Sequence, residues 1–231
     1  MQLELHPDVR LQKLTIGREK APLIVIDNFI ARPEQLLEVA GKLDFAPAGR
    51  LFPGIRAQAP KPYMEFMFGS LRNLLLDYFQ LNGTRLAFSL CHYSIVTTTP
   101  EKLELLQRIP HIDSTDGNGL ATIHYLFSKN LGGTAFYRHR ATGFEYVDRS
   151  RHKQYFGTLE KESGDPGFPG CDYINGDTPF FERIAAQEGV FNRILIYRRN
   201  SLHSGSIDAA FVPDPNPLTG RLSINSFIDI G

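Results

Sequence analysis

The sequence predicts an all-β core with flanking helices, an α+β arrangement in a single domain over residues 1–231. Two observations lead to this class. From residue 84 onward, segments rich in β-branched and aromatic residues alternate with clusters of Gly, Asn, Asp and Pro, which is typical of short strands joined by turns. Before residue 84, two segments carry apolar residues at helical spacing. The chain is long enough to bury one large core.

Residues 1–83 are expected to support this core with one strand and two helices. The apolar run LIVID at 23–27 has the length of a buried strand. A helix is predicted over 33–43, because Pro33 suits a first helical turn and apolar residues follow at helical spacing. A second helix is predicted over 70–81 from one apolar stripe: Leu71, Leu74, Leu75, Tyr78 and Phe79. The stretch between the helices is expected to be irregular, because it contains Pro53, Gly54, Pro60 and Pro62.

The core strands are predicted in five segments of high β-propensity: 84–99, 120–127, 132–139, 192–199 and 220–228. Residues 150–190, before the fourth segment, show little periodicity and contain much Gly, Pro and Asp. We interpret them as an insertion beside the expected active site, partly loop, with a short helix near 179–187. Long ordered loops of this kind are commonly lids or binding loops.

Composition excludes several classes of function. The net charge is zero and the pI is about 7.1, so no overall field favours nucleic acid or an anionic membrane. The only cysteines, Cys91 and Cys171, cannot build a disulfide framework, which indicates a reducing compartment. The N-terminus shows no signal-peptide pattern, and the apolar runs are too short to span a bilayer. A cytoplasmic location is therefore expected.

The motif PHIDSTD contains the strongest indication of chemistry. In an extended strand, residues two apart point to the same face, so His111 and Asp113 direct an imidazole and a carboxylate to one point. A tight metal site needs a third ligand from elsewhere, and His203, just after an apolar strand, is the best candidate. Two imidazoles and one carboxylate suit iron(II) and leave coordination positions open. Zinc is an alternative occupant.

A second pair of residues indicates an acidic ligand. Arg221 and Ser223 again share one strand face. A guanidinium donates two parallel hydrogen bonds to a carboxylate, and the serine hydroxyl can add a third. A dicarboxylate would thus meet the metal at one end and Arg221 at the other. The alternative for Arg221 is a salt bridge with a nearby aspartate.

The ordered pattern H-x-D, a distant His and then R-x-S resembles the 2-oxoglutarate- and iron(II)-dependent dioxygenases, in particular their prolyl-hydroxylase-like branch. LATIHYL, GGTAF and FNRILIYRRNSLHSG resemble successive strands of that superfamily. LFPGIRA together with PHIDSTD resembles an uncharacterised bacterial family within it. The resemblance implies a double-stranded β-helix, the jelly-roll or cupin-like fold. It also implies a hydroxylase with iron(II) as cofactor, 2-oxoglutarate as cosubstrate and dioxygen as reactant.

The resemblance assigns further residues. Tyr125 matches a position that often hydrogen-bonds the far carboxylate of 2-oxoglutarate. Arg56 is a candidate substrate residue, with an exposed loop arginine as the alternative. His139 is another candidate, with a solvated turn residue as the alternative. His124 should face away from Tyr125, because neighbouring strand residues alternate.

The expected partners are a small-molecule, amino-acid or peptide substrate and dioxygen, with neither nucleic acid nor membrane, and a homodimer is left open. Two competing functions remain. One is a cupin-like metal enzyme that does not use 2-oxoglutarate, for which Arg221 has no evident role. The other is a non-catalytic binding or sensor protein. The substrate is not identified, because specificity in such sites depends on pocket shape and on a few polar contacts.

Overall fold

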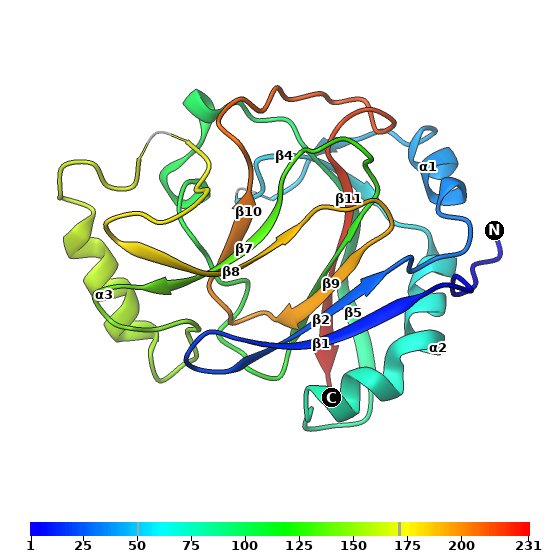
Figure 1. Cartoon of the computed structure of the whole chain (residues 1–231), viewed down its shortest axis with the longest axis horizontal. Helices are drawn as coiled ribbons and strands as arrows, with labels where there is room; N and C mark the ends of the chain where they lie inside the picture. The colour runs from blue at the N-terminus through cyan, green and yellow to red at the C-terminus, as the bar shows by residue number, and fades with distance from the viewer. Residues whose placement is uncertain (50, 171) are drawn as a thin grey trace.

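The computed structural model describes every residue except 50 and 171. Two β-sheets dominate it (Figure 1). The larger has eight strands in the order β1-β2-β9-β6-β11-β5-β4-β3, and the smaller has three in the order β10-β7-β8. Helices α1 and α2 lie at one side of the molecule and α3 at the opposite side (Figure 1).

The elements have the following bounds: β1 Arg10–Ile16, β2 Ala21–Asp27, α1 Glu34–Ala40, β3 Ala46–Pro47, β4 Gly54–Gln58, α2 Lys61–Tyr78, β5 Leu86–Val96, β6 Leu120–Tyr125, β7 Gly133–His139, α3 His152–Glu162, β8 Phe181–Glu188, β9 Ile194–Arg198, β10 His203–Ser206 and β11 Leu222–Ile230. Two short 3-10 helices span Pro100–Lys102 and Leu105–Gln107.

The path of the chain between the sheets identifies the fold. It runs from β5 in the large sheet to His111, which bridges β10 of the small sheet. It returns to β6, crosses to β7 and β8, and then visits β9, β10 and β11, changing sheet each time. All the strand pairs are antiparallel. This alternation is the double-stranded β-helix, or jelly roll, and the predicted fold class is confirmed.

Alternation along the strands divides the core into two layers. Leu23 and Val25 of β2 pack in a cluster between the sheets that also contains Tyr125, Phe136 and Tyr197. Ile24 and Ile26 face the other way, toward a second cluster. That cluster includes one stripe of α2, namely Tyr63, Met67, Leu71 and Leu75. The inner layer therefore surrounds the space between the sheets, and α2 covers the outer face of the large sheet.

Helix α2 begins nine residues earlier than the predicted start at residue 70. Pro60 and Pro62 were expected to keep this stretch irregular, but Pro62 occupies the first turn, where a missing N–H costs nothing. Tyr63 and Met67 then extend the buried stripe of Leu71 and Leu75 by one turn at each step. The prolines mark the beginning of the helix.

The prediction of a short helix near 179–187 was wrong. Residues Phe181–Glu188 form strand β8, paired with β7 along its length. Its sequence FERIAAQE is rich in helix formers, but pairing with a buried strand outweighs this weak preference. The helix of the 150–190 segment is α3, which buries Tyr155 and Leu159 one turn apart. That segment therefore supplies the edge strand of the small sheet as well as a flanking helix.

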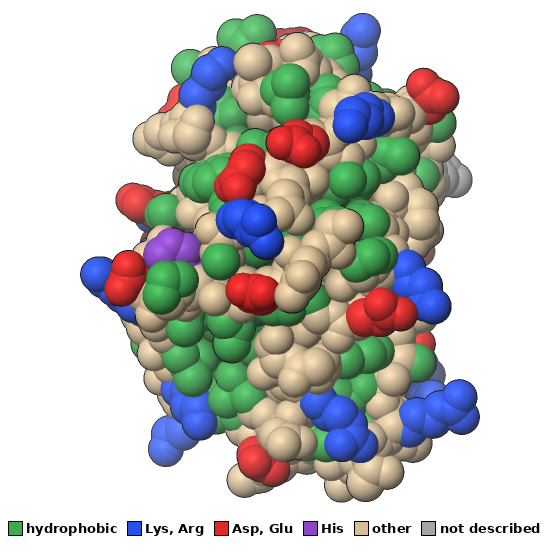
Figure 2. Space-filling model, turned by 90° about the vertical axis from the view of Figure 1, so that its right-hand side faces the viewer, with side chains coloured by type: hydrophobic (Ala, Val, Ile, Leu, Met, Phe, Trp, Pro, Cys, Tyr) green, Lys and Arg blue, Asp and Glu red, His purple; other side chains and the backbone are tan. Residues whose placement is uncertain are grey.

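Acidic and basic side chains are interspersed on the face beside α1 and α2 (Figure 2). Two arginines on either side of residues 139–150 form ion pairs within the fold. Arg138 is buried and bonds Glu145 and Glu182, and Arg151 bonds Glu19. Among the described helices, none combines the length and apolar character needed to cross a membrane.

Candidate metal centre

The two histidines of the predicted metal site lie directly opposite each other on the small sheet. His111 and His203 form an antiparallel bridge, in which the N–H of each donates to the carbonyl of the other at 2.9 and 3.0 Å. Such a pair holds the two Cα atoms about 5.5 Å apart. Their rings lie side by side, with centroids 4.5 Å apart. The backbone therefore positions both imidazoles before any metal binds.

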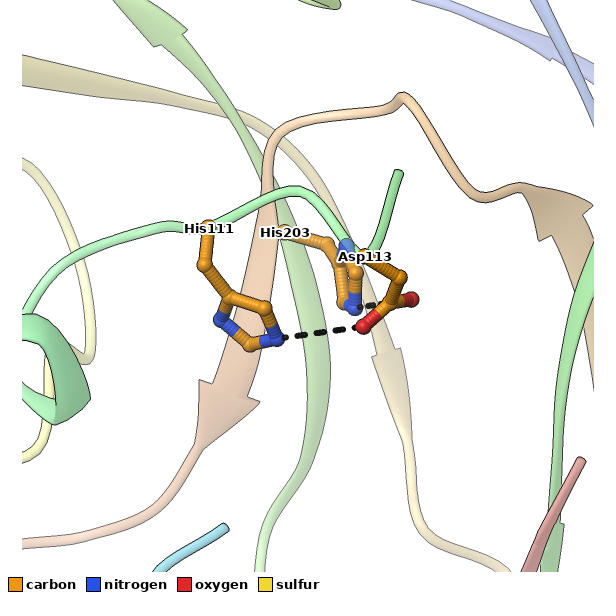
Figure 3. Close-up of side chains that lie close together, drawn as sticks. All are labelled: His111, Asp113 and His203. Carbon is orange, nitrogen blue, oxygen red and sulfur yellow. Dashed lines mark ion pairs between the residues drawn. The ribbon is translucent and has the colours of Figure 1, made fainter. Parts of the chain in front are cut away.

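Asp113 is held beside them by the end of the large sheet. Its N–H donates to the carbonyl of Arg199 at 2.8 Å, just after β9. Its carboxylate oxygens lie 3.7 Å from Nε2 of His111 and 3.6 Å from Nε2 of His203 (Figure 3). One ligand atom from each residue lies within 4.8 Å of the others. Ligands at right angles, about 2.1 Å from one ion, are roughly 3 Å apart, so a small contraction suffices for metal binding.

The protonation states also suit a metal. Nδ1 of His203 lies 3.0 Å from the carbonyl of Ser201, which only accepts hydrogen bonds. The proton is therefore on Nδ1, and the lone pair of Nε2 points at the centre of the group. Burial lowers the pKa of His203 to about 4. The side chain of His111 is 44% exposed within the cavity, and desolvation there, reinforced by His203, lowers its pKa to about 4 as well. Both rings are neutral near pH 7, which is the form that binds metal.

The three side chains line one cavity of about 450 Å³. This volume is within the range of small-molecule sites. Arg221, Ser223 and Arg56 line the same cavity, so the structure brings six of the eight predicted site residues together. Asp113 is the only acidic side chain on its wall among the described residues.

Arg221 is a buried cation at the inner part of the cavity, only 6% exposed. Its Nε donates to the carbonyl of Leu131 at 2.9 Å, and its Nη2 donates to that of Gly133 at 2.8 Å. The guanidinium carbon lies 5.5 Å from the ring centre of Phe127. Within the described part of the chain, Arg221 forms no ion pair, and the expected alternative of a salt bridge with an aspartate is not observed. Burial lowers its pKa. A buried, uncompensated cation of this kind is costly unless a ligand supplies the counter-charge.

The two other residues predicted for the cosubstrate differ in position. Ser223 lines the cavity, and its hydroxyl donates to Oδ1 of Asn225 at 2.8 Å. Tyr125 is fully buried in the inner core cluster and is not on the cavity wall. Its hydroxyl lies 2.7 Å from Oγ1 of Thr134, which does line the cavity. Tyr125 can therefore reach a ligand only through Thr134.

The two predicted substrate residues are separated by the structure. Arg56, on β4, lines the cavity and stacks over Phe52 at 4.1 Å. His139 lies at the far end of β7, is fully buried and is absent from the cavity wall. Its two ring nitrogens are 2.9 Å from Oγ1 of Thr142 and 2.7 Å from Oε2 of Glu162. His139 therefore joins β7 to α3. It is not a solvated turn residue, and it does not contact the cavity.

Sequence reasoning missed two residues of the cavity wall. Tyr197, on β9, lies with its ring 4.7 Å from that of His203 and lines the cavity. Thr134 supplies the hydroxyl beside Tyr125. Both lie on inward strand faces, two residues from an inward neighbour, Leu195 and Phe136 respectively. Period-2 alternation was available as a signal, but aromatic and β-branched residues at such positions are core by default.

Several crystal structures resemble the chain at low identity. HygX from Streptomyces hygroscopicus with nickel and 2-oxoglutarate bound is 14% identical, with a TM-score of 0.46 over 92% of this chain and 84% of that one. EctD from S. alaskensis with bound Fe is 14% identical, with a TM-score of 0.49 over 96% and 84%. The non-heme alpha ketoglutarate dependent epimerase SnoN from nogalamycin biosynthesis is 12% identical, with a TM-score of 0.46 over 87% and 70%. At these values no activity or substrate transfers to this chain.

The family relationship is clearer than the structural one, although it names no activity. No curated protein matches the sequence. A family model described as "Family of unknown function (DUF6445)" matches residues 7–228, nearly the whole chain. The match includes the candidate metal ligands His111, Asp113 and His203, and also Arg56 and Arg221 of the cavity. The chain belongs to this family of unknown function.

Proposed function

We propose that the protein is an iron(II)- and 2-oxoglutarate-dependent oxygenase that hydroxylates a small molecule, an amino acid or a peptide side chain. One observation carries the proposal. A single cavity contains two neutral imidazoles and a carboxylate around one point, together with a buried guanidinium that has no acidic partner in the described part of the chain. The first feature suits a divalent metal, and the second suits an acid that reaches the metal from the other side.

His111, Asp113 and His203 would hold the iron. Two imidazoles and one carboxylate on one face are the ligand set of non-heme iron(II) oxygenases, and they leave the opposite face open. When bound, iron(II) with 2-oxoglutarate and dioxygen converts one substrate C–H to C–OH, while 2-oxoglutarate becomes succinate and carbon dioxide. The backbone bridge between the histidines and the bond from Asp113 to Arg199 fix the ligands on rigid strands.

Arg221 and Ser223 would bind the far carboxylate of 2-oxoglutarate. Two of the guanidinium nitrogens already donate to the backbone carbonyls of Leu131 and Gly133, which holds the group in place. The remaining N–H groups can donate to a carboxylate in a charge-assisted bond. The Ser223 side chain is on the same strand face and lines the same cavity. Its O–H donates to Asn225, and it would turn from this partner to the carboxylate when 2-oxoglutarate binds. The wall is otherwise largely apolar, which strengthens these bonds by excluding water.

Anaerobic titration of the protein with iron(II) and then 2-oxoglutarate tests the proposal. We expect a weak visible charge-transfer band in the wild type. His111→Ala should abolish the band because the metal is lost. Arg221→Ala should keep the metal and weaken 2-oxoglutarate binding by about ten-fold or more, because a charge-assisted hydrogen bond is lost. The exposed Arg10→Gln on β1 is the matched control and should behave as the wild type.

The outcomes separate the competing functions. Metal binding without a band, or an Arg221→Ala variant that binds 2-oxoglutarate as the wild type does, would favour a metal enzyme that does not use this cosubstrate. Failure of the wild type to bind a divalent metal would contradict the proposal as a whole. Circular dichroism and thermal melting of each variant show whether a loss reflects the site or the fold.

A further inference from the structure

A second cation, Arg56, lines the cavity, and it forms no ion pair with any residue that the structure describes. Its Nε donates to Oγ of Ser94 on the neighbouring strand at 3.2 Å. The guanidinium carbon lies over the ring of Phe52, 4.1 Å from its centre. These two contacts fix its plane and leave both terminal nitrogens without a hydrogen-bond partner among the described residues. Burial lowers the pKa of Arg56, and Asp113 is the acidic group whose charge reaches it.

With iron(II) and 2-oxoglutarate bound, the cavity would carry a net charge of one positive unit. Iron(II) contributes two positive charges, Asp113 one negative charge, and 2-oxoglutarate two negative charges. Arg221 then brings the sum to zero. Arg56 adds one positive charge, and no acidic side chain on the described cavity wall other than Asp113 balances it. An unbalanced charge in a largely apolar cavity is unfavourable, so a ligand with one negative charge is favoured there.

Apolar side chains from three segments of the chain line the same cavity as Arg56. Leu51 and Phe52 precede β4, Leu106 follows from the second 3-10 helix, and α3 contributes Phe156. Leu51 is 56% exposed, Leu106 46% and Phe156 38%, so these side chains lie where the cavity meets solvent. Exposed apolar side chains gathered around a cavity mouth are typical of a ligand-binding surface.

Building on the proposed function, we propose that the substrate is a small amphipathic carboxylate with one negative charge. Its carboxylate is held by the two free nitrogens of Arg56, and its apolar body lies against Leu106 and Phe156 at the mouth. A guanidinium fork matches a planar carboxylate in two parallel bonds. A phosphate monoester carries up to two negative charges at neutral pH, which exceeds the surplus in the cavity.

Paired probes that differ only in charge test this assignment. The protein is loaded anaerobically with iron(II) and saturating 2-oxoglutarate, so that Arg221 is already engaged. Octanoate, 3-phenylpropanoate and indole-3-acetate are each titrated by calorimetry beside the corresponding primary amide. In the wild type at least one acid should bind about ten-fold or more tightly than its amide.

The variants separate the two halves of the proposal. Arg56→Gln should remove the preference for the acid over the amide, and Arg56→Lys should retain part of it, because the charge remains but the fork is lost. Phe156→Ala should weaken the acid and the amide alike and leave the preference intact. Arg10→Gln serves again as the exposed control.

Four results would overturn the inference. The first three are equal binding of acids and amides, no binding of any acid, and a preference that survives in Arg56→Gln. Loss of the 2-oxoglutarate band in Arg56→Gln would also overturn it, because Arg56 would then serve the cosubstrate. The 2-oxoglutarate titration of the wild type comes first and without probe. Its failure counts against the proposed function, whereas a normal band with no preference for acids counts against the inference alone.

Discussion

The hydroxyl groups of Tyr125 and Thr134 form a polar link between the inner core and the cavity. They are 2.7 Å apart, and either can be the donor. Burial raises the pKa of Tyr125, so its hydroxyl keeps its proton at neutral pH. If Tyr125 donates to Thr134, the threonine proton is free to point at a ligand beside Arg221. We therefore expect Tyr125 to act on 2-oxoglutarate as a positioning residue through Thr134.

This arrangement predicts that the two hydroxyls act as one unit. Thr134→Val and Tyr125→Phe should each weaken 2-oxoglutarate binding by about five-fold, since one hydrogen bond contributes about 1 kcal/mol. The double variant should be no weaker than Thr134→Val alone, because residues in one network are not additive. The measurement is anaerobic titration of the charge-transfer band. Tyr137→Phe, on the same strand as Thr134, is the control. Its hydroxyl bonds the carbonyl of Ile174 at 3.4 Å, away from the metal group. Additive effects of the two changes would contradict the relay.

At the residue scale, the sequence predicted the features that depend on local spacing, namely which side chains share a strand face. His111 and Asp113 are two residues apart on an extended segment, and so are Arg221 and Ser223, so each pair shares a face by geometry alone. The position of His139 could not be predicted, because its bond to Glu162 depends on where α3 packs. Arg56 was a candidate only by resemblance. Its stacking on Phe52 and its place on the cavity wall follow from a strand that the prolines concealed.

Strand β6 shows how one element serves two layers. Tyr125 faces the inner cluster, while His124 faces α2 and stacks on Tyr63, with ring centres 5.8 Å apart and 9° between the planes. The opposite orientations of these two neighbours were predicted, but the helix that covers His124 was not. Nε2 of His124 is 3.1 Å from Oδ1 of Asn192, an acceptor, so Nε2 carries the proton. Nδ1 then accepts from the Tyr63 hydroxyl at 3.3 Å.

This network predicts a loss of stability in acid. Burial lowers the pKa of His124 to about 4, against about 6.5 in the unfolded chain. Between these values the unfolded state binds more protons, so the free energy of unfolding falls as pH falls from about 6.5 to about 4. The contribution of His124 to this fall is on the order of 3 kcal/mol. Urea unfolding of the metal-free protein at several pH values measures it.

The control compares the replacement of the buried His124 with that of the exposed His152. His124→Asn should make the pH dependence in this window shallower by roughly the same amount, whatever its effect at pH 7. His111 and His203 titrate in both proteins and cancel in the comparison. His152→Asn, at an exposed position of α3, should leave the slope of the wild type unchanged. A His124→Asn profile parallel to that of the wild type would show that the folded network tolerates the protonated ring.

Helices and strands were predictable where their own sequence pattern determines the secondary structure. They were missed where packing against a neighbouring strand determines it. Strand β4 begins at the glycine of a Pro-Gly pair that favours a turn. Gly54 is needed there because β5 approaches closely: an added Cβ would lie 1.9 Å from the carbonyl oxygen of Ile95. Strand β1 is mostly exposed at the edge of the sheet and carries no buried stripe to reveal it. Strand β8 has the composition of a helix and becomes a strand by pairing with β7.

At the scale of the molecule, the three candidate metal ligands come from both sheets. His111 and His203 belong to the small sheet, whereas Asp113 is tied to Arg199 at the end of the large one. The segments come from distant parts of the chain, so their ligands meet only when the jelly roll is complete. A sequence pattern can name such residues in order, but their meeting depends on the whole fold. A metal should therefore bind the folded state alone and stabilise it.

This coupling predicts a measurable gain in stability with metal. At a free metal concentration of 100 times the dissociation constant, binding to the folded state adds about 2.7 kcal/mol to the free energy of unfolding. For a chain of this size that corresponds to a melting temperature roughly 5–10 °C higher. Anaerobic calorimetry with iron(II), or with manganese(II) as a redox-stable substitute, should show this higher melting temperature.

The variants His203→Ala and Asp113→Ala should lose the increase in melting temperature with metal. 2-Oxoglutarate should add a second increment only when metal is present, and the increment should be smaller in Arg221→Ala, because the metal and the arginine bind the two ends of one ligand. A gain that persists in both ligand variants would place the metal elsewhere on the molecule, and a 2-oxoglutarate increment without metal would separate the two halves of the site.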